Sequence, residues 1–232
     1  METTVSEKKN SVKKAKESTT RNLAIGMVLF VVAVGVIFSV LSNKTNSHVA
    51  IPSSVSATDG YGIVFNKDAK TRIDIWEDFQ CPHCREFEDI AGNYLNGLIR
   101  AGKIKAVFHP MTFIGPESIL AASAAACTAD NGKFLDMHTA LYNNQPGSEN
   151  SGTWTNATLK LLAITAGDTS KRTQSCIDAG KYTKWTNNVE ADAAKKNVNS
   201  TPTLFINGVQ LNQAHYLDLA ALKKDLAAAG VK

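Results

Sequence analysis

The sequence predicts an α/β fold in which a small mixed β-sheet is interrupted by a block of helices. Strand-like segments lie at 61–66, 71–79 and 103–111, and a strand–turn–strand segment lies at 201–211. Between them, residues 117–197 have the apolar periodicity of helices separated by Gly, Asn, Pro and Ser. Because strands occur on both sides of this block, we expect one sheet into which a helical domain is inserted.

The first two expected strands flank a short turn of sequence KDAK. In the second strand, Ile73, Ile75 and Phe79 alternate imperfectly with polar residues. Alternation with a period of two residues is the pattern of a half-buried strand. The segment KIKAVFHPM at 103–111 is the third expected strand.

An amphipathic helix is expected directly after the second strand. Apolar residues recur over 87–99 at the spacing of one helix face, and the pattern ends near Gly102. An Asn-Gly pair at 207–208 has the composition of a hairpin turn between two strands. Residues 215–230 then predict a closing helix that ends in glycine.

Residues 23–41 form an uncharged apolar run that is long enough to cross a bilayer as one helix. Six Lys or Arg residues precede the run and only Lys44 follows it closely, so the positive-inside rule places residues 1–22 in the cytoplasm and the rest outside. A cleaved signal peptide is the alternative, but the run is longer than the apolar core of such a peptide, and small residues suited to cleavage lie only at 55–57. Residues 42–60 are small and polar and predict a flexible linker.

The formal charge of +4 comes from the N-terminal tail together with Lys44. Residues 46–232 contain 18 basic and 18 acidic residues, so the part expected outside the membrane is neutral. A neutral domain lacks the basic surface that binds nucleic acid, and we expect no nucleic-acid partner. The lysines of the tail are expected to determine topology, with contact to anionic lipid as a weaker alternative.

The segment FQCPHCREFE at 79–88 contains the residues with the clearest chemistry. Pro82 suits the first position of a helix, which places Cys81 at the helix N-terminus. Unpaired backbone N–H groups and the helix dipole stabilise a thiolate there and lower its pKa. His83 can add a donor or a positive charge, and Cys84 lies one turn further in. We therefore expect one exposed nucleophilic thiol and one resolving thiol.

Three roles fit a Cys-x-x-Cys pair. A zinc site needs a second pair of ligands at suitable spacing, which Cys127 and Cys176 do not supply, so no metal is expected. A structural disulfide is a poor use of so short a loop, because closing it removes little entropy from the unfolded chain. Cys81 and Cys84 lie between an expected strand and an amphipathic helix, and this position agrees best with a redox-active pair. All four cysteines also lie in the part expected outside the membrane, where disulfides form.

The segments WEDFQCPHCREFE and VNSTPTLFINGVQL resemble the DsbA-like branch of the thioredoxin superfamily. More narrowly, they resemble the membrane-anchored extracytoplasmic oxidases of Gram-positive bacteria, especially the actinobacterial type. The resemblance covers about residues 61–230 and implies a thioredoxin fold with an inserted α domain and thiol–disulfide oxidoreductase activity. It implies that Cys81 attacks and that Cys84 resolves the mixed disulfide. It also implies that Pro202 is a cis-proline beside the active site and that the backbone of Thr201 pairs with a substrate peptide as an added strand.

One position departs from the family pattern. Many thioredoxin-like proteins carry a buried, proton-accepting acid six residues before the first cysteine, where this chain has Ile75. Asp74, Glu77 and Asp78 lie nearby but point elsewhere in a regular strand register. Either water or Glu77 then handles the proton, or the three acids are solvated charges at a strand edge. The sequence leaves these alternatives open.

Cys127 and Cys176 lie in helical segments of the inserted block. We expect a structural disulfide between them, with a second redox pair or two free thiols as the alternatives. His109, His138 and His215 follow no ligand pattern and are expected to be structural.

The pattern and the resemblance together predict a membrane-tethered protein-disulfide oxidase outside the cytoplasm, with residues 61–232 as its catalytic domain. Its expected partners are unfolded exported proteins with reduced cysteines and a re-oxidising membrane protein of the VKOR or DsbB kind, and no cofactor is expected. Isomerase-like relatives carry a separate dimerisation domain, for which residues 42–60 leave no room, so a monomer is expected. An isomerase or reductase on the same fold is the nearer alternative, and a non-catalytic binding module for secreted proteins is the other.

Overall fold

The computed structural model describes residues 49–232. The cytoplasmic tail predicted at 1–22, the transmembrane helix predicted at 23–41 and the first part of the predicted linker lie outside these residues. From Val49 to the C-terminus, no helix is both long enough and apolar enough to cross a bilayer.

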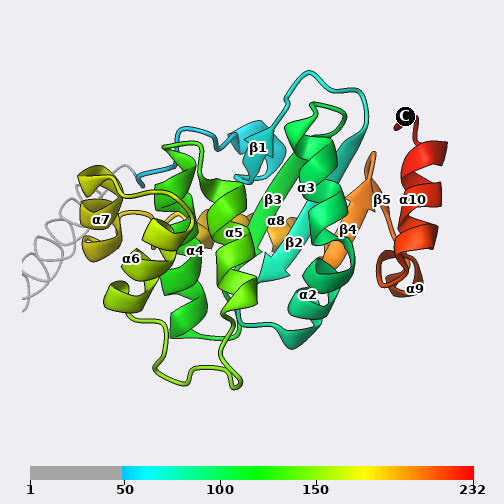
Figure 1. Cartoon of the computed structure of the whole chain (residues 1–232). Coiled ribbons are helices and arrows are strands. Elements are labelled where there is room, and N and C mark those ends of the chain that lie inside the picture. The colour runs from blue at the N-terminus through cyan, green and yellow to red at the C-terminus, as the bar shows by residue number, and fades with distance from the viewer. Residues whose placement is uncertain (1–48) are drawn as a thin grey trace, which may run out of the picture. The chain divides into compact units, whose positions relative to one another are not determined.

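Strands and helices follow one another along the chain in the order that the sequence predicts (Figure 1). The elements are a 3-10 turn η1 (Ala57–Asp59), β1 (Ile63–Phe65), β2 (Arg72–Asp78), α2 (Pro82–Phe87), a π-helical turn η2 (Glu88–Gly92), α3 (Asn93–Arg100), β3 (Lys105–Met111), α4 (Pro116–Ala129), α5 (Phe134–Asn143), α6 (Asn156–Thr165), α7 (Lys171–Asp178), α8 (Thr186–Lys195), β4 (Thr203–Ile206), β5 (Val209–Gln210), α9 (Gln213–Tyr216) and α10 (Leu219–Ala228).

The five strands form one mixed sheet in the order β1-β3-β2-β4-β5. β2 pairs in parallel with β3 and antiparallel with β4, so it is the central strand. Ile75, at its middle, lies opposite Phe108 on one side and Leu204 on the other. The prediction of a small mixed sheet interrupted by a helical insertion is confirmed.

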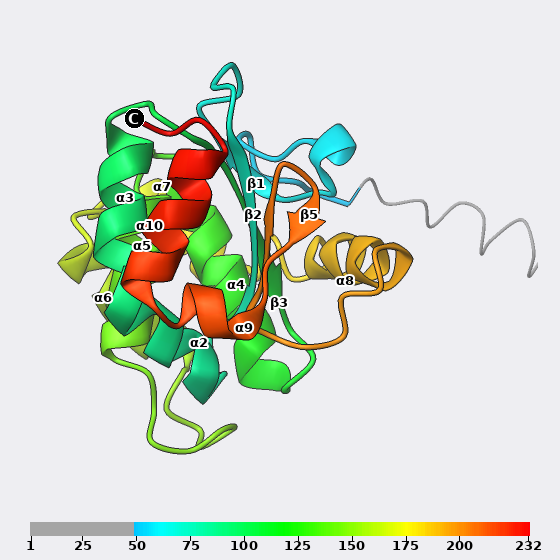
Figure 2. The same ribbon diagram turned by 90° about the vertical axis from the view of Figure 1, so that its right-hand side faces the viewer.

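Helices cover both faces of this sheet. α3 and α10 lie on one face and α8 lies on the other (Figure 2). All residues of β2 from Ile73 to Asp78 are buried. A central strand covered on both faces has no solvent side, so polar and apolar residues need not alternate in it. This is the physical reason for the imperfect alternation in the sequence.

The inserted block is built around α4. Its small residues are almost all buried, and it packs against α5, α6 and α7. A disulfide joins Cys127 of α4 to Cys176 of α7, with an S–S distance of 2.00 Å. The bond therefore lies within the insertion and ties its first helix to a later one.

Removing this disulfide is expected to lower stability by about 4 kcal/mol, because it closes a loop of about 50 residues in the unfolded chain. The double variant Cys127→Ala/Cys176→Ala should show this loss in denaturant unfolding. The pKa of Cys81 should not change, since the bond lies outside the sheet. A shift in that pKa, or unchanged stability, would contradict a purely structural role.

The predicted linker is too long at its C-terminal end. The backbone N–H of Ser53 donates to Asp130 Oδ1 at 2.9 Å, and Val55 forms a β-bridge with Ile63. Asp59 pairs with Lys105 at 2.8 Å. Residues 53–60 are therefore part of the folded domain, because their backbone and acidic side chain find partners in it.

The single helix expected up to Gly102 is interrupted. α2 passes into the π-helical turn η2 before α3 continues. Apolar spacing does not reveal such a turn, because one inserted residue shifts the helix face only locally. π-turns in proteins occur frequently at functional sites.

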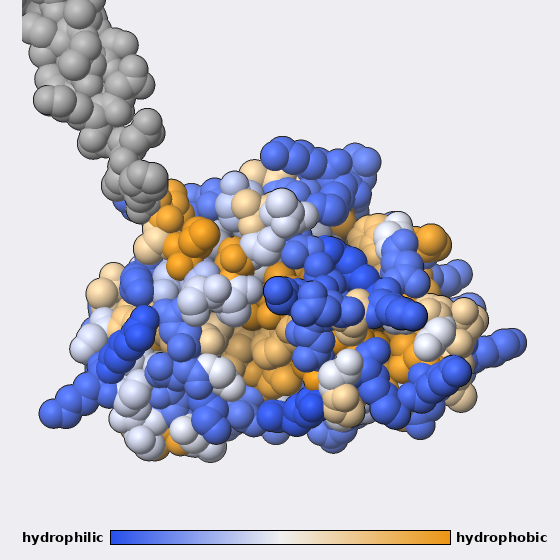
Figure 3. All heavy atoms as spheres, turned by 90° about the horizontal axis from the view of Figure 1, so that it is seen from above, coloured by the Kyte–Doolittle hydropathy of each residue, from blue (hydrophilic) through white to orange (hydrophobic). Residues whose placement is uncertain are grey.

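The molecular surface is mixed in character. Hydrophilic residues alternate with smaller apolar patches on the face seen from above (Figure 3). The large apolar side chains that are exposed among the described residues are Val49, Ile51, Phe113, Leu161, Ile164 and Val209.

Candidate active site

The cysteine pair lies where β2 leads into α2. Cys81 has an extended backbone and is the N-cap residue of α2, and Pro82 takes the first helical position. The backbone N–H groups of Cys84 and Arg85 donate to the carbonyl of Cys81 at 3.1 and 3.2 Å. The local structure is the one predicted from the sequence, and it places the Cys81 thiol beside a helix N-terminus.

Both active-site thiols are free and both residues are buried. Cys81 exposes 7% of its surface and Cys84 exposes none. The expectation of an openly exposed nucleophile is therefore wrong. The reason is the segment before β4, where the Thr201 carbonyl lies 3.5 Å from Cys81 Sγ and the Thr201–Pro202 peptide bond is cis. The hydroxyl of Tyr216 donates to the Pro202 carbonyl at 2.9 Å and holds this segment in place.

The two thiols have opposite acidities. A hydrogen bond from the Cys84 thiol lowers the pKa of Cys81 to about 5, with further contributions from the Thr201 side chain and from the backbone N–H groups of Cys84 and His83. Burial raises the pKa of Cys84 well above its ordinary value. At neutral pH, Cys81 is thus a thiolate and Cys84 is a thiol.

The His83 side chain contacts the next turn of α2. The ring is exposed, and Nδ1 lies 3.4 Å from Glu86 Oε2 on the next turn. The part of His83 that contributes to the lowered pKa of Cys81 is its backbone N–H. A contribution from the imidazole charge stays a prediction.

Thr201 has a hydroxyl suited to the thiolate. Its Oγ1 is buried and has no hydrogen-bond partner within residues 49–232, and the Thr201 side chain is among the groups that lower the pKa of Cys81. Replacing Thr201 with Val is expected to raise the Cys81 pKa by about one unit or more, because a hydrogen bond to a charged group contributes about 1.5–3 kcal/mol. Thiolate absorbance measured across pH checks this, with Thr201→Ser as the matched control that keeps the hydroxyl. Equal pKa values in the Val and Ser variants would contradict it.

The three acids near the pair are buried, which rules out the alternative of solvated charges at a strand edge. Although burial opposes it, pairing with Arg72 and His109 lowers the pKa of Asp74 to about 2 and engages this carboxylate away from the cysteines. Burial raises the pKa of Asp78 to about 6, and burial also raises the pKa of Glu77. Glu77 and Asp78 therefore remain as buried acids near Cys81.

Asp78 holds the active-site loop in place. Its carboxylate accepts hydrogen bonds from the Ser118 hydroxyl at 2.6 Å and from the Gln80 backbone N–H at 2.9 Å, and its own carbonyl accepts from the Cys81 N–H at 2.9 Å. Gln145, which follows α5, donates to the carbonyls of Phe79 and Cys81 at 2.8 and 3.0 Å. Sequence reasoning missed Ser118 and Gln145, because only the fold brings the insertion to this loop.

An acidic thiol at a helix N-terminus, a buried second thiol three residues later and a helical domain inserted into the sheet are the features of a DsbA-like thiol–disulfide oxidoreductase with a Cys81–Cys84 pair.

Comparison with known proteins agrees with this class. The family model Thioredoxin_4, described as Thioredoxin, matches residues 60–224, and the chain belongs to this family. The "Probable disulfide bond formation protein D" of Bacillus anthracis is 24% identical over 220 residues, which are 90% of this chain and 96% of that protein. The solved structure of MdbA, a thiol-disulfide oxidoreductase from Actinomyces oris, has a TM-score of 0.67 at 20% identity and covers 78% of this chain and 91% of its own. Reduced DsbA from Mycobacterium tuberculosis has a TM-score of 0.56 at 26% identity and covers 77% of this chain and 96% of its own.

Proposed function

We propose that this protein is a membrane-anchored protein-disulfide oxidase that introduces disulfide bonds into unfolded exported proteins outside the cytoplasm. The observation that carries the proposal is the geometry of the pair: Cys81 lies at the N-terminus of α2 with the Thr201 carbonyl 3.5 Å from its Sγ, and Cys84 is fully buried. This arrangement lowers the pKa of Cys81 and raises the pKa of Cys84.

The pair accepts two electrons in two exchange steps. A substrate thiolate attacks Cys81 Sγ of the oxidised pair, which forms a mixed disulfide and releases the sulfur of Cys84. A second substrate thiolate then attacks the substrate sulfur of that mixed disulfide and releases Cys81 as a thiolate. The substrate gains one disulfide, and the pair is left reduced.

The thiolate of Cys81 favours this direction. A good leaving thiol has a low pKa, and a stabilised reduced form makes a pair oxidising. Thiol pKa values are about 3.5 in DsbA and about 7 in thioredoxin. The value of about 5 for Cys81 lies between these two, and it is well below the pH at which the protein would work.

Assays with ribonuclease test this function. With reduced, unfolded ribonuclease, the oxidised protein is expected to generate active enzyme and to lose its own disulfide. Faster recovery from scrambled ribonuclease than from the reduced form would instead make the protein an isomerase. Inactivity with both substrates would favour a non-catalytic binding module.

The anchor and the re-oxidising partner belong to the same proposal. The apolar run at 23–41 and the basic residues before it support an uncleaved anchor with the catalytic domain outside. Each turnover leaves the pair reduced, so a quinone-linked membrane protein of the VKOR or DsbB kind is the expected oxidant.

The topology is tested separately. Protease added to whole cells should remove the catalytic domain and spare the cytoplasmic tail, whereas a soluble form that lacks residues 1–57 would indicate a cleaved signal peptide.

A further inference from the structure

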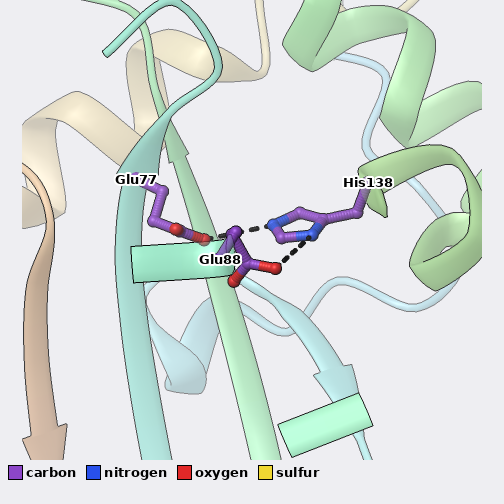
Figure 4. Close-up of side chains that lie close together, drawn as sticks. All are labelled: Glu77, Glu88 and His138. Atoms are coloured by element: carbon purple, nitrogen blue, oxygen red, sulfur yellow. Dashed lines mark hydrogen bonds and ion pairs between the residues drawn. The ribbon is translucent and has the colours of Figure 1, made fainter. Parts of the chain in front are cut away.

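Two groups of charged side chains lie outside the exchange steps above. The first is buried beside the cysteine pair and consists of Glu77 of β2, Glu88 of η2 and His138 of α5 (Figure 4). His138 Nε2 lies 3.1 Å from Glu77 Oε2, and this group belongs to the site already described. The second group is exposed and basic, and it surrounds Asp130 just after the end of α4.

The first described residues lie along the surface of the domain, and alternate side chains face outward. Ala50 packs against the core and Pro52 is buried. Val49 and Ile51, in contrast, are 38% and 43% exposed. Figure 3 shows an apolar patch at the place where the described chain begins. Two β-branched apolar side chains are therefore held outward in a position where water alone gains nothing from them.

Asp130 connects this segment to the basic side chains. Ser53 donates to Asp130 Oδ1 through its backbone N–H at 2.9 Å and through its hydroxyl at 3.0 Å. Oδ2 of the same carboxylate lies 3.7 Å from Arg172 and 3.8 Å from Lys181. The side chains of Arg172 and Lys181 are 69% and 43% exposed, whereas that of Asp130 is 5% exposed. The two cations therefore face solvent close to the outward apolar pair.

The positive charge at this place is local. Residues 171–184 contain four basic residues and one acidic residue, whereas residues 46–232 as a whole are neutral. The acidic residue, Asp178, pairs with Lys160 at 2.7 Å. The four basic residues are all exposed. Together with the outward apolar pair they form what we call the basic face: Val49, Ile51, Lys171, Arg172, Lys181 and Lys184.

A hollow of about 280 Å³ lies within the basic face. Arg172, Lys181, Asp130 and Ser175 line it, together with Ala179 and the two disulfide cysteines of the insertion. Asp130 offsets one of the two positive charges, and the other is left for an anion. Guanidinium and ammonium groups bind phosphate oxygens through charged hydrogen bonds, and a nearby hydroxyl adds a donor. The hollow therefore suits a phosphate group.

The sequence before the basic face indicates what its partner is. The apolar run at 23–41 ends eight residues before Val49. Since a residue spans at most about 3.6 Å, Val49 stays within about 29 Å of the end of the run. With the run in the bilayer, as proposed above, the basic face is always close to lipid headgroups. A tether of this length raises the effective concentration of one surface at the other.

We propose that the basic face docks on the anionic headgroups of the bilayer that holds the anchor. The proposal rests on the proposed anchor and is independent of the direction of electron transfer. Val49 and Ile51 enter the boundary between headgroups and acyl chains, and the four basic side chains bind headgroup phosphates.

Docking holds the cysteine pair at a fixed height above the lipid. At the start of α4, Ser118 donates to Asp78 Oδ1 at 2.6 Å beside the active-site loop, and Asp130 follows the end of the same helix. Twelve residues of helix separate Ser118 from Asp130, which corresponds to about 18 Å. In Figure 1, α2 and α7 accordingly lie well apart. The active site therefore remains open to exported chains while the basic face contacts lipid.

Hydrogen–deuterium exchange of the full chain in lipid nanodiscs tests the docking. One set of discs contains phosphatidylcholine alone, and the other contains phosphatidylglycerol as well. Backbone amides in residues 49–53 and 171–184 are expected to exchange at least about fivefold more slowly in the anionic discs, because one basic residue near an anionic bilayer changes binding by about a factor of five. Residues 203–228 should exchange equally in both sets.

Two charge variants locate the effect. Arg172→Gln/Lys181→Gln should abolish the difference between the two sets of discs, and unchanged exchange in the neutral discs would show that the fold is kept. Lys223→Gln/Lys224→Gln removes the same charge from α10 and should preserve the difference. High salt should abolish it in the wild type, because salt screens exposed charges.

Several results would overturn the docking. Equal exchange in both sets of discs would do so, as would a difference that persists in Arg172→Gln/Lys181→Gln or disappears in the α10 control. Slower exchange that requires a re-oxidising membrane protein in the disc would make the basic face a protein interface instead. Release of the chain from the discs would refute the proposed anchor, whereas a chain that stays in the discs without slower exchange would refute the docking alone.

Discussion

Replacing Cys84 with Ala is expected to trap peptides on Cys81 as stable mixed disulfides. The Cys81 thiolate attacks a disulfide-linked peptide dimer, expels one peptide as a thiol and keeps the other. In the wild type, Cys84 displaces the second peptide. Without Cys84 no protein thiol is close enough to do so, because the other two cysteines are joined to each other in the insertion. The adduct should therefore rise from a transient species to nearly all of the protein.

The reciprocal variant should form no adduct. In Cys81→Ala, the remaining active-site thiol is Cys84, which is fully buried and whose pKa is raised. Because the thiolate is the reacting species, Cys84 is not expected to attack the peptide at neutral pH. Intact-mass measurement of both variants after incubation with the peptide dimer checks the assignment. Adducts on Cys84, or equal adduct formation in the two variants, would reverse the roles of the two cysteines.

The reduced protein is expected to be more stable than the oxidised protein at neutral pH, and less stable in acid. The folded pKa of Cys81 is about 5, whereas an unfolded thiol has a pKa of about 8.5. A thiol whose folded pKa is depressed contributes stability above the unfolded pKa and loses it as the pH falls through the folded pKa. The contribution is about 3 kcal/mol at pH 7 and close to zero below about pH 5.

The disulfide stabilises the oxidised protein by a smaller amount. Closing a four-residue loop in the unfolded chain contributes about 2 kcal/mol. The two effects become equal between about pH 6 and 7, and above this range the reduced form is more stable. Denaturant unfolding of both forms between acidic and neutral pH measures this crossing. An oxidised form that is more stable across the whole range would favour a reductase.

Local sequence was enough to predict the helix start at Pro82, the acidic thiol of Cys81 and the sheet with its insertion. Each depends on residues that are close together in the chain or on periodicity within one element. Pro82 defines the first turn of α2, and that turn supplies the N–H groups beside Cys81. The thioredoxin fold, which the family resemblance implied, is confirmed by the observed sheet and by the family model that matches residues 60–224.

The buried acids could not be predicted in the same way. Glu77 is buried because β2 is the central strand and is covered on both faces, which depends on the order of strands in space. His138 reaches Glu77 from 61 residues further along the chain. The one sequence signal for the buried acids was the spacing of four residues between Cys84 and Glu88, which places both on the same side of a helix.

The reduction potential of the Cys81–Cys84 pair against a glutathione buffer tests the central claim most directly, since it gives the direction of electron flow. The stabilised Cys81 thiolate predicts an oxidising potential, between that of DsbA at about −120 mV and about −200 mV. A potential near that of thioredoxin, at about −270 mV, would contradict the proposal and make the protein a reductase.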